Sequence, residues 1–167
     1  MKKYIYASLF LAVALLGGCS KAEPEPEPAE QVIGSYTVDK IVESYKYATA
    51  TTEQSYTTAL PIKGTGYELS AVLDVAKSAS NIVTISFVQT VKYTAAGKAP
   101  QKTTDAFNSI ELKKIDASPG EFDMLDTGVK IGTIGKNAIT FEEVSNEKDS
   151  LGRAYVYTFK MTGKKAL

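Results

Sequence analysis

The side chains that could carry acid–base chemistry in this chain are carboxylates, lysines and tyrosines, because it contains no histidine and a single cysteine, Cys19. Histidine is the commonest general base and the commonest transition-metal ligand, so its absence excludes Ser-His-Asp and Cys-His machinery. Two facing carboxyl groups roughly 5 to 9 Å apart would still suffice for glycoside hydrolysis. The carboxylates that cluster in sequence are Glu121, Asp123, Asp126, Glu142, Glu143 and Glu147.

These carboxylates are poorly spaced for catalysis. Glu142 and Glu143 are adjacent and would point to opposite faces of a strand, and Asp123 and Asp126 flank a turn. The segment 146–150 has the composition of a calcium loop without its alternating acidic positions and distant glutamate. We therefore expect solvated surface charge, with no catalytic residue, no cofactor and no metal site. A carboxylate hydrolase is the last-ranked alternative.

The N-terminal segment has the layout of a secretory signal. Two lysines precede an apolar run at 9–16, and two glycines then lead into the cysteine. A membrane-spanning helix needs about 20 apolar residues, so this run is too short for a permanent span. The sequence Leu16-Gly17-Gly18-Cys19 resembles the lipobox of bacterial lipoproteins, which implies cleavage after Gly18 and acylation of Cys19.

This resemblance implies an anchored protein that has membrane lipid as its partner through acylated Cys19. Each buried methylene of an acyl chain such as palmitate contributes about 0.8 kcal/mol, so two or more chains hold a protein permanently. In that family a serine such as Ser20 after the cysteine favours the outer membrane. The acidic residues that follow resemble signals for export to the cell surface, so the surface and the periplasmic face both remain open.

The segment after the cysteine alternates glutamate with proline and contains no apolar residue larger than alanine. Such a segment cannot bury enough area to offset its ordering entropy, and it favours an extended polyproline II conformation. We therefore expect a signal peptide over residues 1–18, a lipidated tether over 19–30 and one domain over 31–167. The 19 basic and 19 acidic residues balance and form no basic stripe, so nucleic acid is not an expected partner.

The domain sequence has the period of two that is typical of β-strands, with Val, Ile, Thr, Tyr and Phe in runs that Gly, Asn, Asp, Pro or Lys separate. No convincing helix interrupts it. The pattern predicts an all-β fold, a single antiparallel up-and-down barrel of about eight strands, with a β-sandwich as the alternative. The expected strands are 35–43, 45–57, 67–75, 81–93, 106–115, 121–126, 129–134, 138–144 and 154–162.

Local features add detail to this prediction. The strand at 45–57 is poor in aliphatic residues, which indicates an edge. Phe107 is out of phase with Ile110, which indicates a β-bulge. The segment Gly135-Lys136-Asn137 has the residues of a hairpin turn, and the small, polar segment 95–102 indicates a loop.

Two motifs resemble lipocalin-like barrels. The segment Gly34-Ser35-Tyr36 is similar to the Gly-x-Trp signature of their first strand, and the hairpin at 132–141 is similar to the penultimate hairpin of lipocalin-like lipoproteins. Tyr36 stands where the family has tryptophan, and the chain has no tryptophan. In lipocalins an arginine near the end of the last strand stacks on that ring. Here Arg153 precedes the last strand, and Lys160 is the nearest cation to the expected place.

The resemblance implies a cup that inward-facing residues would line, although the same residues could equally form an ordinary packed core. We expect the protein to bind a small amphipathic or hydrophobic ligand there without catalysis. The alternative is a structural or accessory cell-surface lipoprotein that recognises protein or glycan through loops such as 95–102. The ligand-lining candidates are Tyr67, Leu69, Leu73, Val83, Ile85, Phe87, Tyr155, Tyr157 and Phe159.

Overall fold

The structure, a computed structural model, describes residues 25–166. The predicted signal peptide, its cleavage site at Gly18, the lipidation site Cys19 and the tether as far as Pro24 lie outside the described residues. The elements are α2 (Pro28–Val32), β1 (Gly34–Tyr47), β2 (Gln54–Ala59), β3 (Ile62–Gly64), β4 (Tyr67–Ala79), β5 (Ile82–Tyr93), β6 (Gln101–Lys114), β7 (Glu121–Asp126), β8 (Val129–Gly135), β9 (Ala138–Lys148) and β10 (Ala154–Lys165).

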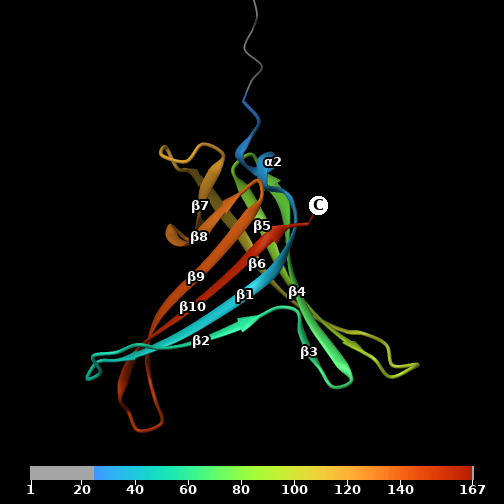
Figure 1. Cartoon of the computed structure of the whole chain (residues 1–167). Helices are drawn as coiled ribbons and strands as arrows, with labels where there is room; N and C mark the ends of the chain where they lie inside the picture. The colour runs from blue at the N-terminus through green and yellow to red at the C-terminus, as the bar shows by residue number, and fades with distance from the viewer. Residues whose placement is uncertain (1–24, 167) are drawn as a thin grey trace, which may run out of the picture.

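The strands form one antiparallel sheet in the order β2-β1-β10-β9-β8-β7-β6-β5-β4-β3. An additional pairing of β1 with β4 closes eight of the strands into an up-and-down barrel, from which β2 and β3 are left as extra strands (Figure 1). The predicted all-β fold and antiparallel barrel are confirmed, and the sandwich alternative is not adopted. Closure suits this chain because it leaves fewer unpaired strand edges.

The barrel is closed only at one end. β1 pairs with β4 over Gly34–Thr37 and pairs with β2 further along, over Lys40–Tyr45. The short strands β7 and β8 also stop early, since β8 reaches β9 only at 139–141. Beyond these points the sheet divides into a first wing, formed by β2, β1, β10 and β9, and a second wing, formed by β3, β4, β5 and β6 (Figure 1).

The hydrophobic core occupies the closed end, where successive inward-facing residues of each strand are buried. Tyr36 of β1 lies at its centre with no exposed surface, and its hydroxyl lies 2.7 Å from the carbonyl oxygen of Val32 and 2.9 Å from that of Gly135. The largest other fully buried side chains are Phe122, Leu73, Ile85, Ile110, Met124, Ile134, Ile139, Val32, Val38 and Val83.

The helix α2 covers the closed end, which corrects the expectation of an extended tether as far as Glu30 and of a domain without helices. Ala29 and Val32 are fully buried against the barrel. The proline at the first position of α2 suits a helix start, since its missing N–H would have had no partner there. Ala29 and Val32 thus contribute buried apolar area, although the glutamate–proline pattern predicted an extended chain.

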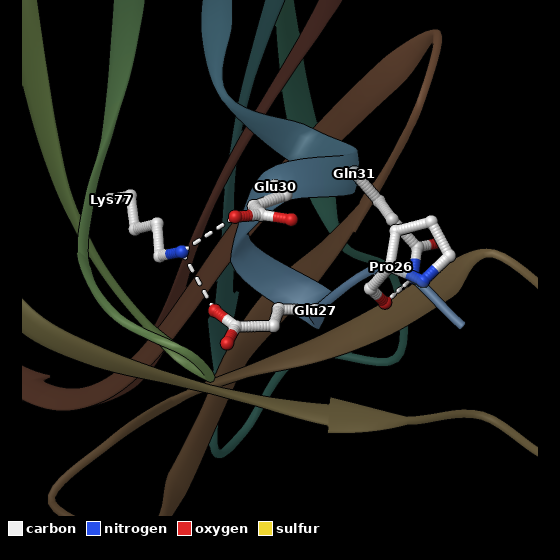
Figure 2. Close-up of polar contacts among 5 residues, drawn as sticks. All are labelled: Pro26, Glu27, Glu30, Gln31 and Lys77. Atoms are coloured by element: carbon white, nitrogen blue, oxygen red, sulfur yellow. Dashed lines mark hydrogen bonds and ion pairs between the residues drawn. The ribbon is translucent and has the colours of Figure 1, made fainter. Parts of the chain in front are cut away.

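The acidic residues that were expected to belong to a free spacer contact the barrel instead. Lys77 of β4 lies 2.7 Å from a carboxylate oxygen of Glu27 and 2.8 Å from one of Glu30, as Figure 2 shows. Glu25 lies 2.6 Å from Lys114 of β6. These pairs are exposed, so each adds little stability by itself, but together they fix the direction in which the chain enters the domain.

The strand boundaries and pairings bear on three local predictions. The strand predicted at 45–57 is wrong, because a turn at 48–53 ends β1 at Tyr47 and begins β2 at Gln54. The predicted bulge is confirmed, since Phe107 pairs with Ile85 while Ile110 pairs with Val83. The hairpin predicted at 135–137 is also confirmed, and it joins β8 to β9.

The cation that lies over Tyr36 is Lys165 rather than Lys160. The Lys165 Nζ atom is 5.6 Å from the centre of the Tyr36 ring. Lys160 lies on the outer face of β10 and is 3.3 Å from a carboxylate oxygen of Glu142. The expectation for Lys160 is therefore wrong, because the last strand extends further than predicted, to Lys165.

Across the part of the chain that the structure describes, residues 25–166, no helix combines the length and the apolar character that a membrane span requires.

The hydroxyl of Tyr36 is expected to stabilise the closed end. Tyr36→Phe should lower the free energy of unfolding by about 1–2 kcal/mol at neutral pH, because two buried carbonyls lose their donor. Burial raises the pKa of Tyr36 to about 12. The unfolded chain therefore releases this proton first, and the contribution of the phenol, complete below about pH 10, is lost as the pH rises towards 12. Urea unfolding at neutral and alkaline pH measures both effects.

Tyr56→Phe serves as the matched control, because Tyr56 is 59% exposed. Its free energy of unfolding should stay within about 0.5 kcal/mol of the parent value. Equal behaviour of the two variants at every pH would show that Tyr36 does not hold the closed end.

Candidate functional site

The inner face of the first wing carries aromatic and acidic side chains in cross-strand rows. Residues that pair directly across antiparallel strands share a face. Tyr45 pairs with Tyr157, and Tyr47 pairs with Tyr155. Because Met161 and Phe159 of the same strand point into the barrel, these four tyrosines also point inward. We call Tyr45, Tyr47, Tyr155 and Tyr157 the tyrosine row.

The rings of the tyrosine row contact one another. The ring centres are 5.1 Å apart for Tyr45 and Tyr157, 5.9 Å for Tyr45 and Tyr155, and 5.4 Å for Tyr47 and Tyr155. Tyr56 of β2 adds a fifth ring, 6.1 Å from Tyr45. Such pairs contribute about 0.5–1.5 kcal/mol each beyond the area they bury. They stabilise the part of the first wing that has no other layer of the barrel packed against it. They also offer apolar ring faces next to polar hydroxyl groups.

Glu43 lies at the inner end of the tyrosine row. The hydroxyl of Tyr157 donates a hydrogen bond of 2.8 Å to Glu43 Oε1. Burial is the main cause that raises the pKa of Tyr157, and the hydrogen bond to Glu43 and the charge of Glu43 add to it. Burial likewise raises the pKa of Tyr45, followed by the charge of Glu43. The phenols therefore stay neutral over a wide pH range, next to a negative charge.

A cavity of about 200 Å³ lies between this row and the packed core. Leu60, in the connection from β2 to β3, and Ile62, the first residue of β3, form one wall, and β4 forms another through Leu69. Most of the lining is apolar, with a few polar groups that could orient a ligand, as is usual in small-molecule sites. The lining residues are Ile41, Glu43, Thr58, Leu60, Ile62, Leu69, Ala71, Gln89 and Phe159.

The structure separates the predicted lining residues into groups. Leu69 and Phe159 line the cavity, and Tyr155 and Tyr157 belong to the tyrosine row. Phe87 packs against the core, and Tyr67 is 40% exposed beside Gly64. The three that fill the interior and have no exposed surface are Leu73, Val83 and Ile85.

Sequence reasoning missed Glu43, Tyr45, Tyr47 and Tyr56 as parts of this site. The sequence does place Tyr45 and Tyr47 on one face, but the shortage of aliphatic residues there indicated an exposed edge. Pairing with β10 brings these rings against Tyr155 and Tyr157 instead. The signal that could have found them is that two strands, β1 and β10, both have tyrosines at alternate positions, because such strands form aromatic cross-strand pairs when they are neighbours in a sheet.

The carboxylates considered for catalysis do not converge. Glu142 points outward to Lys160 while Glu143 points inward, and Asp123 pairs with Lys130 at 2.6 Å. Asp149 accepts hydrogen bonds from the backbone N–H groups of Leu151 and Arg153 within its turn. Within residues 25–166, no three His, Cys, Asp or Glu side chains are grouped so that they could hold a metal ion.

The chain matches no protein-family model and shows no significant similarity to a curated protein. The proposed role of the site is therefore argued from the residues of this chain alone.

The charge of Glu43 should be visible in the titration of Tyr157. Glu43→Gln removes a negative charge and should lower the pKa of Tyr157, yet leave it above the ordinary value of 10.0 because burial is the larger cause. The near-ultraviolet absorbance of tyrosinate follows the titration, and Tyr157→Phe identifies which step belongs to this residue. Glu142→Gln, on the outer face, should change nothing. An unchanged titration in Glu43→Gln would contradict the assigned contact.

Proposed function

We propose that this chain is a non-catalytic lipoprotein that acylated Cys19 holds at the outer membrane. Its barrel binds a small amphipathic ligand in the open half, by which we mean the space between the two wings. The observation that carries the binding proposal is the apolar cavity under the β2–β3 connection, which is continuous with the tyrosine row through Glu43. An apolar body fits the cavity, and a polar end fits beside the hydroxyl and carboxylate groups. Both features suit an amphipathic molecule.

The closed end supports a relationship to lipocalin-like barrels. A barrel of eight antiparallel strands is compatible with that fold. Lys165 near the end of β10 lies over the ring of Tyr36 in β1, which is similar to the stacked arginine and tryptophan that the resemblance implies. The helix α2 covers the same end. In such an arrangement a ligand can enter only from the opposite, open half, where the tyrosine row lies.

The direction of the anchor supports the same entry route. The described chain begins at Glu25, beside the closed end, which it contacts through Lys114 (Figure 1). An extended chain spans at most about 3.6 Å per residue, so Cys19 lies within roughly 20 Å of Glu25. An acylated Cys19 would therefore hold the closed end towards the bilayer and turn the open half away from it. The ligand would then arrive from the aqueous side.

A second candidate function, recognition of a protein or glycan, is favoured by exposed apolar side chains on the first wing. Val144 of β9 is 59% exposed, Val156 of β10 is 38% exposed, and Leu151 in the turn between these strands is 76% exposed. Apolar side chains gathered on one part of a surface mark interaction sites more often than scattered ones do. The two functions are compatible, since both use the open half.

Binding in the cavity is tested with naphthalenemethanol, a small neutral amphipathic probe, and the full chain in phosphatidylcholine nanodiscs. Calorimetric titration, with empty nanodiscs as the blank, should show saturable binding. Leu69→Trp fills the cavity and should weaken binding at least about tenfold, which corresponds to 1.4 kcal/mol. Ser70→Trp is the matched control, because Ser70 faces the other side of β4, and it should retain the affinity. No saturable binding, or equal loss in both variants, would contradict the proposal.

The anchor is tested by the intact mass of the full chain after expression in a Gram-negative host and detergent extraction. The mature chain should begin at Cys19 and carry the mass of its acyl chains. Cys19→Ala should abolish both processing and acylation, because the lipobox needs the cysteine. A parent protein without acyl mass would rule out the lipoprotein assignment but would leave the binding proposal standing.

A further inference from the structure

Several strands of the two wings direct carboxylates into the open half. Glu143 pairs with Phe159, Glu147 pairs with Tyr155, and Asp105 pairs with Phe87. These carboxylates therefore point into the open half, as does Glu43 opposite Phe159. Lysines in the wing portions of the same strands alternate with inward residues and so point outward; examples are Lys46, Lys92, Lys102, Lys148 and Lys160.

The inward carboxylates are not neutralised by the protein itself. Among the ion pairs of residues 25–166, none involves Glu43, Glu143, Glu147 or Asp105. The charges of Glu43 and Glu143 both help to raise the pKa of Tyr157, after burial and its hydrogen bond to Glu43. These four carboxylates outnumber Lys98 and Arg153, the cations that lie over inner-face tyrosines, and Arg153 is itself paired with Asp149, so the space between the wings is electrically negative. Low-dielectric walls strengthen such a field, and the field attracts ligands of the opposite sign.

The tyrosine faces in this space accept cations. The guanidinium carbon of Arg153 lies 5.1 Å from the ring centre of Tyr47, and Lys98 Nζ lies 3.6 Å from that of Tyr93. Tyr47 belongs to the tyrosine row, and Tyr93 lies on the inner face of the second wing. A ring face is the negative end of the aromatic quadrupole, so it attracts a cation.

We infer that the ligand of the open half is an organic cation, in which an ammonium or guanidinium group is joined to an apolar body. This inference rests on the proposed binding function and specifies its ligand class. The cationic group lies against Tyr45 and Tyr157 beside Glu43, whose carboxylate also borders the cavity, and the apolar body occupies that cavity. An anionic amphiphile such as a fatty acid would instead meet four inward carboxylates.

The test compares three probes that share one ring system: naphthylmethyl-trimethylammonium, naphthalenemethanol and naphthylacetate. Each is titrated into the full chain in phosphatidylcholine nanodiscs, with empty nanodiscs subtracted. We expect the cation to bind at least about tenfold more tightly than the anion, with the neutral probe between them. Added salt should weaken binding of the cation but not of the neutral probe, because only the charged pair is screened.

Two sets of matched variants show whether the inner carboxylates cause this preference. The inner set combines Glu43→Gln, Glu143→Gln and Glu147→Gln, and the outer set combines Glu68→Gln, Glu111→Gln and Glu142→Gln. Both sets change the net charge equally, so a difference between them reports position rather than total charge. The inner set should lose most of the tenfold preference, and the outer set should keep it. Thermal unfolding followed by circular dichroism confirms that both sets are folded.

Two further single variants address the ring faces. Tyr45→Phe keeps the aromatic face and should keep the preference for the cation, whereas Tyr45→Leu should reduce it several-fold. If the neutral probe binds but the cation binds no more tightly than the anion, or if the inner and outer sets behave alike, the inference is overturned while the binding function stands. If none of the probes binds, both proposals fail.

Discussion

The architecture depends on how one edge of β1 divides its backbone hydrogen bonds between two partners, while the other edge pairs with β10. Its first four residues, Gly34–Thr37, pair with β4, and the later part pairs with β2. A strand edge presents N–H and C=O groups that must be paired or hydrated, so this change of partner decides where the sheet closes and where it opens. The closed end becomes a dry core, and the open half becomes a space between two wings. The cavity and the tyrosine row lie on the open side of that change, whereas Leu73, Val83 and Ile85 lie on the closed side.

The same alternation of side chains has different consequences in the two halves. At the closed end, inward positions face residues from the opposite side of the barrel, so aliphatic and aromatic side chains fill the interior. In the open half the wings diverge, and inward positions have no such neighbours. Tyrosines suit that environment because the rings bury area against each other while the hydroxyls remain available to water or to Glu43. The packing of the wing and the site proposed on it thus have one origin.

Contacts between cations and tyrosine rings recur at both ends of the molecule. Lys165 lies over Tyr36 beneath the helix α2, and Arg153 lies over Tyr47 at the tip of the first wing. At the closed end the contact is internal and helps to seal the barrel. In the open half, uncompensated carboxylates surround the ring faces and their charge is available to a ligand. The position of each ring relative to the closure determines whether it packs in the core or belongs to the proposed site.

Much of the fold was determined by the sequence itself, because a period of two, a Lys136-Asn137 turn and the phase shift before Ile110 are local properties of the chain. The helix α2 was not, since it depends on burial against distant strands. The split of the predicted strand at 45–57 was not either, because the turn at 48–53 contains none of the Gly, Pro, Asn or Asp residues that mark turns. The position of Tyr45 and Tyr47 within a site likewise required their pairing with β10, more than a hundred residues away. Alternation tells which side chains share a face. Only the long-range register, which is set by the burial of apolar surface, decides what that face encloses.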